Sequence, residues 1–160
     1  MKSFELKPIG IVRTPFQDLK NMPIQPGGAS GVRGTLEIFS EFQEGLKDVE
    51  LFSHLFLLYR FHRAVRTSLE VIPFLDSEKR GVYATRSPLR PNHIGLSVVH
   101  LLERKENILD IENVDILDGT PLLDIKPYVL QFDGVENPSS GWITANSHEV
   151  AAKRSDERFL

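Results

Sequence analysis

The most apolar stretch of this chain runs from His54 to His62 and reads His-Leu-Phe-Leu-Leu-Tyr-Arg-Phe-His. Its length suits a β-strand and is far below the roughly 20 residues that a membrane-spanning helix needs. Because apolar residues follow one another without alternation, the run predicts a strand buried on both faces, at the centre of a sheet. His62 ends this strand, where barrel mouths hold ligands. We expect His54, at its start, to be a structural histidine.

Short segments with alternating or β-branched apolar residues surround this central strand. They cover residues 5–13, 32–39, 69–74, 94–102, 108–116 and the stretch that follows Asp118. The chain has no repeated strand–helix units and no glycine-rich nucleotide-binding motif, which argues against a Rossmann sheet. We therefore expect a mainly β fold, a small antiparallel β-barrel with a few short helices.

The strand pattern weakens beyond Phe132, where a linker rich in Gly, Asn, Pro and Ser begins. Residues 1–132 are therefore expected to form the barrel domain. Residues 133–160 are expected to form a C-terminal linker and a helix, and not an independent domain. That helix is predicted from about Ser147, as N-cap, to Arg158. A shorter helix is predicted from Ser40, which forms a capping-box pattern with Gln43.

The composition narrows the possible functions. The 160 residues carry a formal charge of −3, which argues against a strongly basic nucleic-acid binder but allows a local basic patch. The chain contains no cysteine, which excludes disulfides, a cysteine nucleophile and a thiolate metal site, and we expect no metal. The first seven residues lack the apolar core of a signal peptide, so we expect a cytoplasmic protein without a membrane segment.

A stiff basic loop lies between two strand-like segments, from Val82 to Ser97. Its prolines fix φ and remove backbone donors, so the side chains of Arg86 and Arg90 are held apart. Two arginines held in this way suggest an anion site. The alternative is a pair of solvated loop arginines that bind carbonyl oxygens.

Two further segments carry polar residues in patterns of interest. Asp118-Gly119-Thr120-Pro121 has the residues of a tight turn. On the strand that follows, Asp124, Lys126 and Tyr128 alternate and should project to one side, either as a salt-bridged edge or as a site. The long segment from Gln17 to Gly31 is rich in Pro and Gly and predicts either a binding loop or a flexible flap.

Several of these segments together resemble the TsaA-like family, also called the TrmO-type tRNA methyltransferases. The similarity extends in motif order from about Glu5 to Phe132 and rests on Pro8–Pro15, Phe52–Leu55, Phe61-His62, Ala84–Gly95 and Asp118–Tyr128. It implies a small β-barrel that binds S-adenosylmethionine and works as a homodimer, with the cofactor near the subunit interface. It also implies methylation of the exocyclic N6 of threonylcarbamoyladenosine in the anticodon loop of tRNA.

Carried over by motif, the family's cofactor contacts fall on ten residues of this sequence. They are Gln25, Pro26, His62, Arg63, Arg86, Leu96, Asp118, Gly119, Thr120 and Pro121. Their types suit the cofactor, since its carboxylate needs an arginine or backbone amides and its adenosine needs an apolar wall. The chain departs from the family pattern at Ile24, where many members have arginine, and at His93, where proline is usual.

Methyl transfer from a sulfonium depends mainly on alignment, but the modified nitrogen is a weak nucleophile and would benefit from a proton acceptor. We assign this role to Asp124, with Lys126 and Tyr128 orienting the substrate. Arg90 and Arg13, together with Arg63, are expected to meet tRNA phosphates. The alternative functions are a regulatory or sensor module that binds S-adenosylmethionine without methyl transfer, and a purely structural barrel that recruits another protein.

Overall fold

The computed structural model describes residues 4–159 and contains a closed barrel of six antiparallel strands, in the order β1-β2-β7-β6-β3-β8. The barrel strands are β1 (Gly10–Arg13), β2 (Arg33–Ile38), β3 (His54–Arg60), β6 (Ile94–Lys105), β7 (Ile108–Glu112) and β8 (Thr120–Pro127). A separate two-stranded sheet joins β4 (Glu70–Val71) to β5 (Arg80–Gly81). The predicted mainly β barrel is confirmed.

Alternate residues of the barrel strands fill its interior with branched apolar side chains. The fully buried residues include Val12, Leu36, Leu55, Leu57, Val99, Leu109, Ile111 and Leu122. Short 3₁₀ turns, η2 (Ser40–Leu46) and η3 (Val49–Leu51), connect β2 to β3. Leu46 of η2 joins the core, so this connection closes one end of the barrel.

The central strand differs from its prediction in one respect. It is central, because β3 lies between β6 and β8. Its residues nevertheless alternate: Leu55, Leu57 and Tyr59 are buried, whereas Phe56 and Leu58 are only partly covered. A single chain therefore buries one face of an apolar strand and leaves the other face half open.

Helices are fewer and shorter than the sequence predicted. The C-terminal helix α2 comprises only Ser147–Ala152, and its N-cap is Asn146, which forms a capping box with Glu149. The chain then extends, because Ser155 forms backbone bonds with Asn21 and Met22 instead of continuing the helix. The predicted capping box at Ser40 is wrong, since η2 begins without a side-chain cap. The remaining helical pieces are η1 (Pro26–Gly28), η4 (Val82–Ala84), α1 (Leu130–Asp133) and η5 (Glu157–Phe159).

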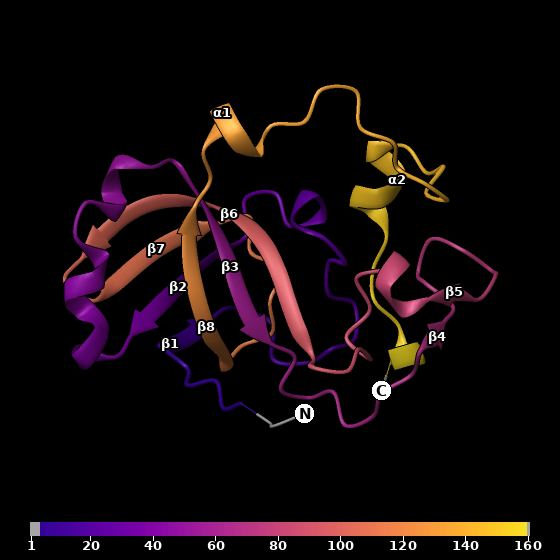
Figure 1. The fold of residues 1–160 in the computed structure, drawn as a ribbon, viewed down its shortest axis with the longest axis horizontal. Helices are drawn as coiled ribbons and strands as arrows, with labels where there is room; N and C mark the ends of the chain where they lie inside the picture. The colour runs from indigo at the N-terminus through magenta and orange to yellow at the C-terminus, as the bar shows by residue number, and fades with distance from the viewer. Residues whose placement is uncertain (1–3, 160) are drawn as a thin grey trace.

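The chain beyond the barrel returns to the long loops. Figure 1 shows the barrel on the left, and the 61–93 loop with the C-terminal chain on the right. Trp142 donates its indole N–H to the carbonyl of Ala84 at 2.8 Å, and Arg158 donates to the carbonyl of Pro73 at 2.7 Å. The C-terminal segment, residues 142–159, thus connects the 14–32 loop to the 61–93 loop. No helix within residues 4–159 has the length and apolar character needed to cross a membrane.

Candidate active site

The predicted cofactor residues lie around one end of the barrel. We call this end the mouth: β1, β3 and β7 end there, and β2, β6 and β8 begin there. Because neighbouring strands are antiparallel, the three segments that leave the mouth are residues 14–32, 61–93 and 113–119. These segments, with the first residues of β6 and β8, contain every residue that the family resemblance assigns to the cofactor. The topology therefore brings together positions that are nearly 100 residues apart in sequence.

The two longest loops meet through Arg86 and Gln25. The guanidinium Nη1 of Arg86 donates to Oε1 of Gln25 at 2.8 Å. Pro26 begins η1 directly afterwards, so its ring fixes the chain that carries Gln25. Arg86 is exposed, and its contact with a neutral amide leaves its charge available to an anion.

The turn from Asp118 to Pro121 is anchored to the end of β1. The carboxylate of Asp118 accepts from the backbone N–H of Thr14 at 3.0 Å, and the N–H of Gly119 donates to the carbonyl of Val12 at 2.9 Å. Gly119 has φ of +73°, a left-handed conformation that glycine adopts without strain. The sequence prediction of a tight turn agrees with this geometry.

His62 lies beside this turn. Its Nδ1 is 3.3 Å from Oγ1 of Thr120, and the Thr120 hydroxyl donates its proton to the carbonyl of Leu117 at 2.6 Å. Partial burial lowers the pKa of His62, and the neighbouring charges of Arg63 and Arg60 lower it further. The imidazole is therefore biased toward its neutral form, which can accept a hydrogen bond.

A buried polar group, which the sequence prediction missed, lies just inside the mouth. Tyr59 and Ser97 are 5% and 2% exposed, and their oxygens are 3.1 Å apart. Ser97 Oγ also donates to Asp115 Oδ1 at 2.7 Å. Burial raises the pKa of Asp115 to about 6. The signal in the sequence was a polar residue at Ser97, in phase with the inward-facing Val99 and Leu101.

The predicted catalytic residues lie on the outer surface of the barrel. Lys126 Nζ is 2.9 Å from Asp124 Oδ2, and both side chains are exposed by about half or more. The ring of Tyr128 packs 5.5 Å from that of Phe56. The three side chains share one face, as their alternation indicated, and this face also carries Leu96. Leu58 pairs with Leu96 on one side and with Asp124 on the other, so these three residues form a row.

The two arginines predicted to bind substrate make contacts within the chain. Arg13 forms a half-exposed ion pair with Glu37 at 2.9 Å, an arrangement that contributes little to stability. Arg90 donates to the carbonyls of Thr85 and Ser87, at 3.1 and 3.3 Å, and so stiffens the loop that carries Arg86. His93, where the family usually has proline, adopts φ of +50° and contacts the carbonyl of Pro88 through Nδ1 at 2.8 Å.

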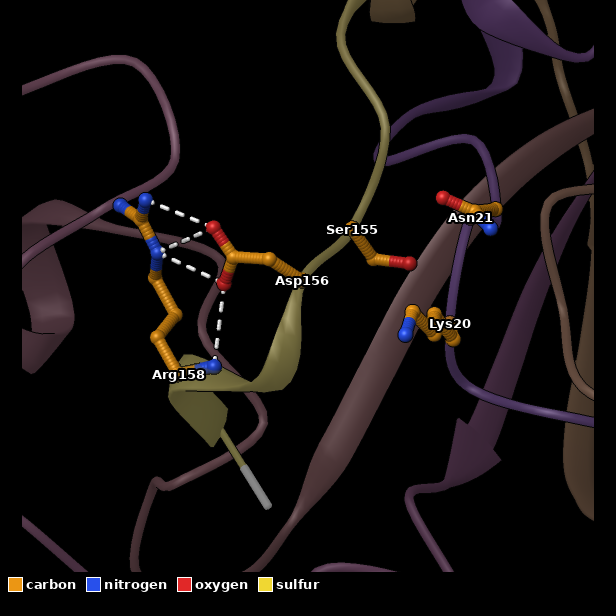
Figure 2. A pocket seen from close by; sticks show the side chains of 5 residues that line it. All are labelled: Lys20, Asn21, Ser155, Asp156 and Arg158. Atoms are coloured by element: carbon orange, nitrogen blue, oxygen red, sulfur yellow. Dashed lines mark hydrogen bonds and ion pairs between the residues drawn. The ribbon is translucent and has the colours of Figure 1, made fainter.

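A shallow hollow of about 540 Å³ lies next to the C-terminal segment (Figure 2). It is lined by Lys20, Asn21, Ser155, Asp156 and Arg158. Arg158 is paired with Asp156 at 2.7 Å, and none of the predicted site residues lines the hollow. No group of His, Asp and Glu side chains within residues 4–159 is arranged to hold a metal ion.

Comparison with known proteins gives a consistent result. Residues 11–134 match the family described as tRNA-methyltransferase O N-terminal domain. The chain is 57% identical over 154 residues to a probable S-adenosyl-L-methionine-binding protein of Pyrococcus abyssi, covering 96% of this chain and 84% of the relative. It is 33% identical over 168 residues to the tRNA (adenine(37)-N6)-methyltransferase of Escherichia coli, covering 98% and 72%.

Solved structures agree in fold. The crystal structure of TrmO from Pseudomonas aeruginosa superposes with a TM-score of 0.74 at 39% sequence identity. The match covers 88% of this chain and 63% of that structure. The resemblance drawn from the sequence motifs is confirmed: the chain belongs to the family of the tRNA-methyltransferase O N-terminal domain.

Proposed function

We propose that this chain transfers a methyl group from S-adenosylmethionine to the exocyclic N6 of threonylcarbamoyladenosine in the anticodon loop of tRNA. The family assignment and the name of the E. coli relative support methylation of a tRNA adenine at N6. The main structural support is that Gln25, Arg86 and the 118–121 turn lie together at the barrel mouth.

The residues around the mouth fit the cofactor. Arg86 supplies a guanidinium for its carboxylate, and the 118–121 turn supplies backbone groups for the ribose. Leu96, which is 45% exposed, supplies apolar surface for the adenine. When bound, S-adenosylmethionine supplies an electrophilic methyl group on a sulfonium. The work of the protein is then to hold the acceptor nitrogen in line with that methyl group and to exclude water.

We propose Asp124 as the proton acceptor, with Lys126 and Tyr128 orienting the substrate base. Support comes from the row that places Asp124 next to Leu58 and Leu96 on the outer face. The ion pair with Lys126 holds the Asp124 carboxylate in one position. A carboxylate on the same face as Leu96, the proposed adenine wall, has the chemistry that proton removal requires.

The phosphates of tRNA are proposed to meet arginines around the mouth. Arg60 ends β3 and Arg63 lies three residues further on. Both are exposed and, among the described residues, form no ion pair with a carboxylate. Arg13 can exchange its weak contact with Glu37 for a phosphate, because a half-exposed ion pair is worth about 1 kcal/mol or less. Arg90 is bound to two carbonyls and contributes through loop rigidity as well as charge.

We further propose that the chain works as a homodimer through the outer face of β3, β6 and β8. This face exposes or half exposes Phe56, Leu58, Leu96 and Val98. The apolar run of β3 predicts burial on both faces, and a second copy would provide the missing cover. In such a dimer the proposed adenine wall and Asp124 lie at the interface, so the partner completes the site.

The experiment that tests the function uses purified protein, S-adenosylmethionine labelled in its methyl group and bulk tRNA. Label that appears in threonylcarbamoyladenosine after digestion to nucleosides supports the proposal. The matched control is tRNA that lacks the threonylcarbamoyl group. Label in unmodified adenosine would identify a different substrate. Saturable cofactor binding without transfer would favour the sensor function, which the name of the P. abyssi relative also allows.

A further inference from the structure

A short chain of hydrogen bonds leads from the barrel interior to the mouth. It joins Tyr59 to Ser97 at 3.1 Å and Ser97 to Asp115 at 2.7 Å. The single hydroxyl proton of Ser97 is donated to Asp115, so Tyr59 is the donor in the first bond. Both hydroxyl groups are therefore oriented toward the carboxylate, and they hold it in one position.

The position of Asp115 disfavours the ionised form of its carboxyl group. Burial raises its pKa, which means that the surroundings oppose its negative charge. The positive charge that acts on it is that of Arg86, which lowers the pKa values of both Asp115 and Tyr59. Within residues 4–159, however, no ion pair joins the two groups: Arg86 donates to Gln25, and Asp115 accepts from Ser97.

The segment that carries Asp115 is bonded to the loop that carries Gln25, the partner of Arg86. The backbone N–H of Gly31 donates to the Asn113 side chain at 3.0 Å, and the N–H of Val114 donates to the carbonyl of Val32 at 3.4 Å. Asp115 is therefore the residue after Val114, which is bonded to the last residue of the loop that carries Gln25. The Asp115 carboxylate and the Arg86 guanidinium thus belong to segments of the same mouth but do not form an ion pair with each other.

A carboxylate and a guanidinium on segments of the same mouth, without an ion pair between them, match a zwitterion, and the amino-acid part of S-adenosylmethionine is one. We propose that Asp115 is a cofactor-binding residue that receives the ammonium group of this moiety, while Arg86 receives its carboxylate. The inference rests on the proposed function, since it assumes that cofactor. The inference adds Asp115 to the cofactor-binding residues and predicts a preference for ligands with a primary amine. Ser97 and Tyr59 hold the carboxylate that binds this amine.

The test measures the binding of three ligands by isothermal titration calorimetry. S-adenosylhomocysteine carries the full zwitterion, its decarboxylated counterpart keeps only the amine, and 5′-methylthioadenosine has neither group. The variants are Asp115→Asn, which keeps an acceptor for Ser97, and Ser97→Ala, which keeps the carboxylate without its support. Asp110→Asn, on β7, is the matched control. Thermal unfolding is recorded for each variant.

We expect Asp115→Asn to weaken the two amine-bearing ligands about tenfold, the loss of one charge-assisted contact, and to leave 5′-methylthioadenosine within twofold. Ser97→Ala should weaken the same two ligands by a smaller factor. If Asp115→Asn does not fold, the Ser97→Ala result tests the inference. An equal loss for all three ligands would mean a packing role and would overturn the inference. So would an unchanged affinity for the decarboxylated ligand. If the unaltered protein binds none of the three, the cofactor assignment itself fails.

Discussion

Ser155 and Met22 are joined in both directions across more than 130 residues of sequence. The backbone N–H of Ser155 donates to the carbonyl of Met22 at 2.9 Å, and Oγ of Ser155 accepts from the N–H of Met22, also at 2.9 Å. The same hydroxyl donates to the carbonyl of Leu19. This connection fixes the C-terminal segment to the loop that carries Gln25.

Ser155→Ala should therefore loosen that loop. Met22 is buried, so its N–H would lose a partner that solvent does not readily replace. We expect a loss of about 1–3 kcal/mol in the free energy of unfolding and faster hydrogen exchange at residues 19–25. Ser139→Ala is the control, because that exposed hydroxyl accepts only a long bond of 3.5 Å from Gly141. Equal exchange rates in the two variants would contradict the role given to Ser155.

Gly95 is required by the ring that packs on it. A Cβ at this position would lie 2.3 Å from Cε2 of Tyr59, which pairs with Gly95 across β3 and β6. Gly95→Ala should displace the ring and reduce the free energy of unfolding by about 1–3 kcal/mol, as measured by urea denaturation. Gly45→Ala has open space around its new methyl group and should stay within about 0.5 kcal/mol of the unaltered protein. A neutral Gly95→Ala would mean that Tyr59 can move freely.

Asp115 should make stability fall as the pH rises. Its pKa is about 6 in the folded chain against an ordinary value of 3.8. Between these values the folded protein holds a proton that the unfolded chain has released, so the free energy of unfolding decreases through this window. Asp115→Asn lacks this decrease and should gain, relative to the unaltered protein, about 3 kcal/mol between pH 3.5 and pH 8.

Urea denaturation at several pH values measures this difference. His62 has a lowered pKa and contributes a change of opposite sign, but it is present in both proteins and cancels in the comparison. A difference that stays constant with pH would show that the Asp115 carboxyl titrates normally.

Leu58 is central to the proposed dimer face, between Leu96 and Asp124. Leu58→Asp would place a carboxylate in an apolar interface, and we expect the variant to sediment as a monomer in analytical ultracentrifugation. Leu51→Asp, at an equally apolar but distant site that is 78% exposed, is the control and should leave the dimer intact. A monomeric unaltered protein, or a dimeric Leu58→Asp variant, would exclude this face.

Asp124→Asn tests the proton acceptor directly. The amide keeps the size of the side chain and cannot accept a proton, so we expect single-turnover methylation to slow by about 100-fold or more. Cofactor affinity should remain within about twofold, because Asp124 is not proposed to contact the cofactor. Glu41→Gln removes an exposed carboxylate on η2 and serves as the comparison. A normal single-turnover rate for Asp124→Asn would remove the residue from the mechanism.

The sequence by itself determined the fold class and the motifs. Alternating strands, turn residues and the run from His54 to His62 identified a β-barrel with β3 at its centre, because side-chain periodicity is a local property of the chain. Motif order identified the family, and it predicts the ten cofactor positions. The tight turn at Asp118 also followed from local residue preferences, since Asp and Gly stabilise it without distant contacts.

Only the tertiary structure decided which residues meet. The bond between Arg86 and Gln25, the outward position of Asp124 and the connection of Ser155 to Met22 all depend on strand register and chain return. The shortened C-terminal helix has the same cause, since backbone bonds to a distant loop replaced helical ones. Asp115 shows the limit most clearly. A lone carboxylate beside Val114 and Ile116 looks ordinary in sequence. Only the tertiary structure bonds it to the buried Ser97 and exposes it to the charge of Arg86.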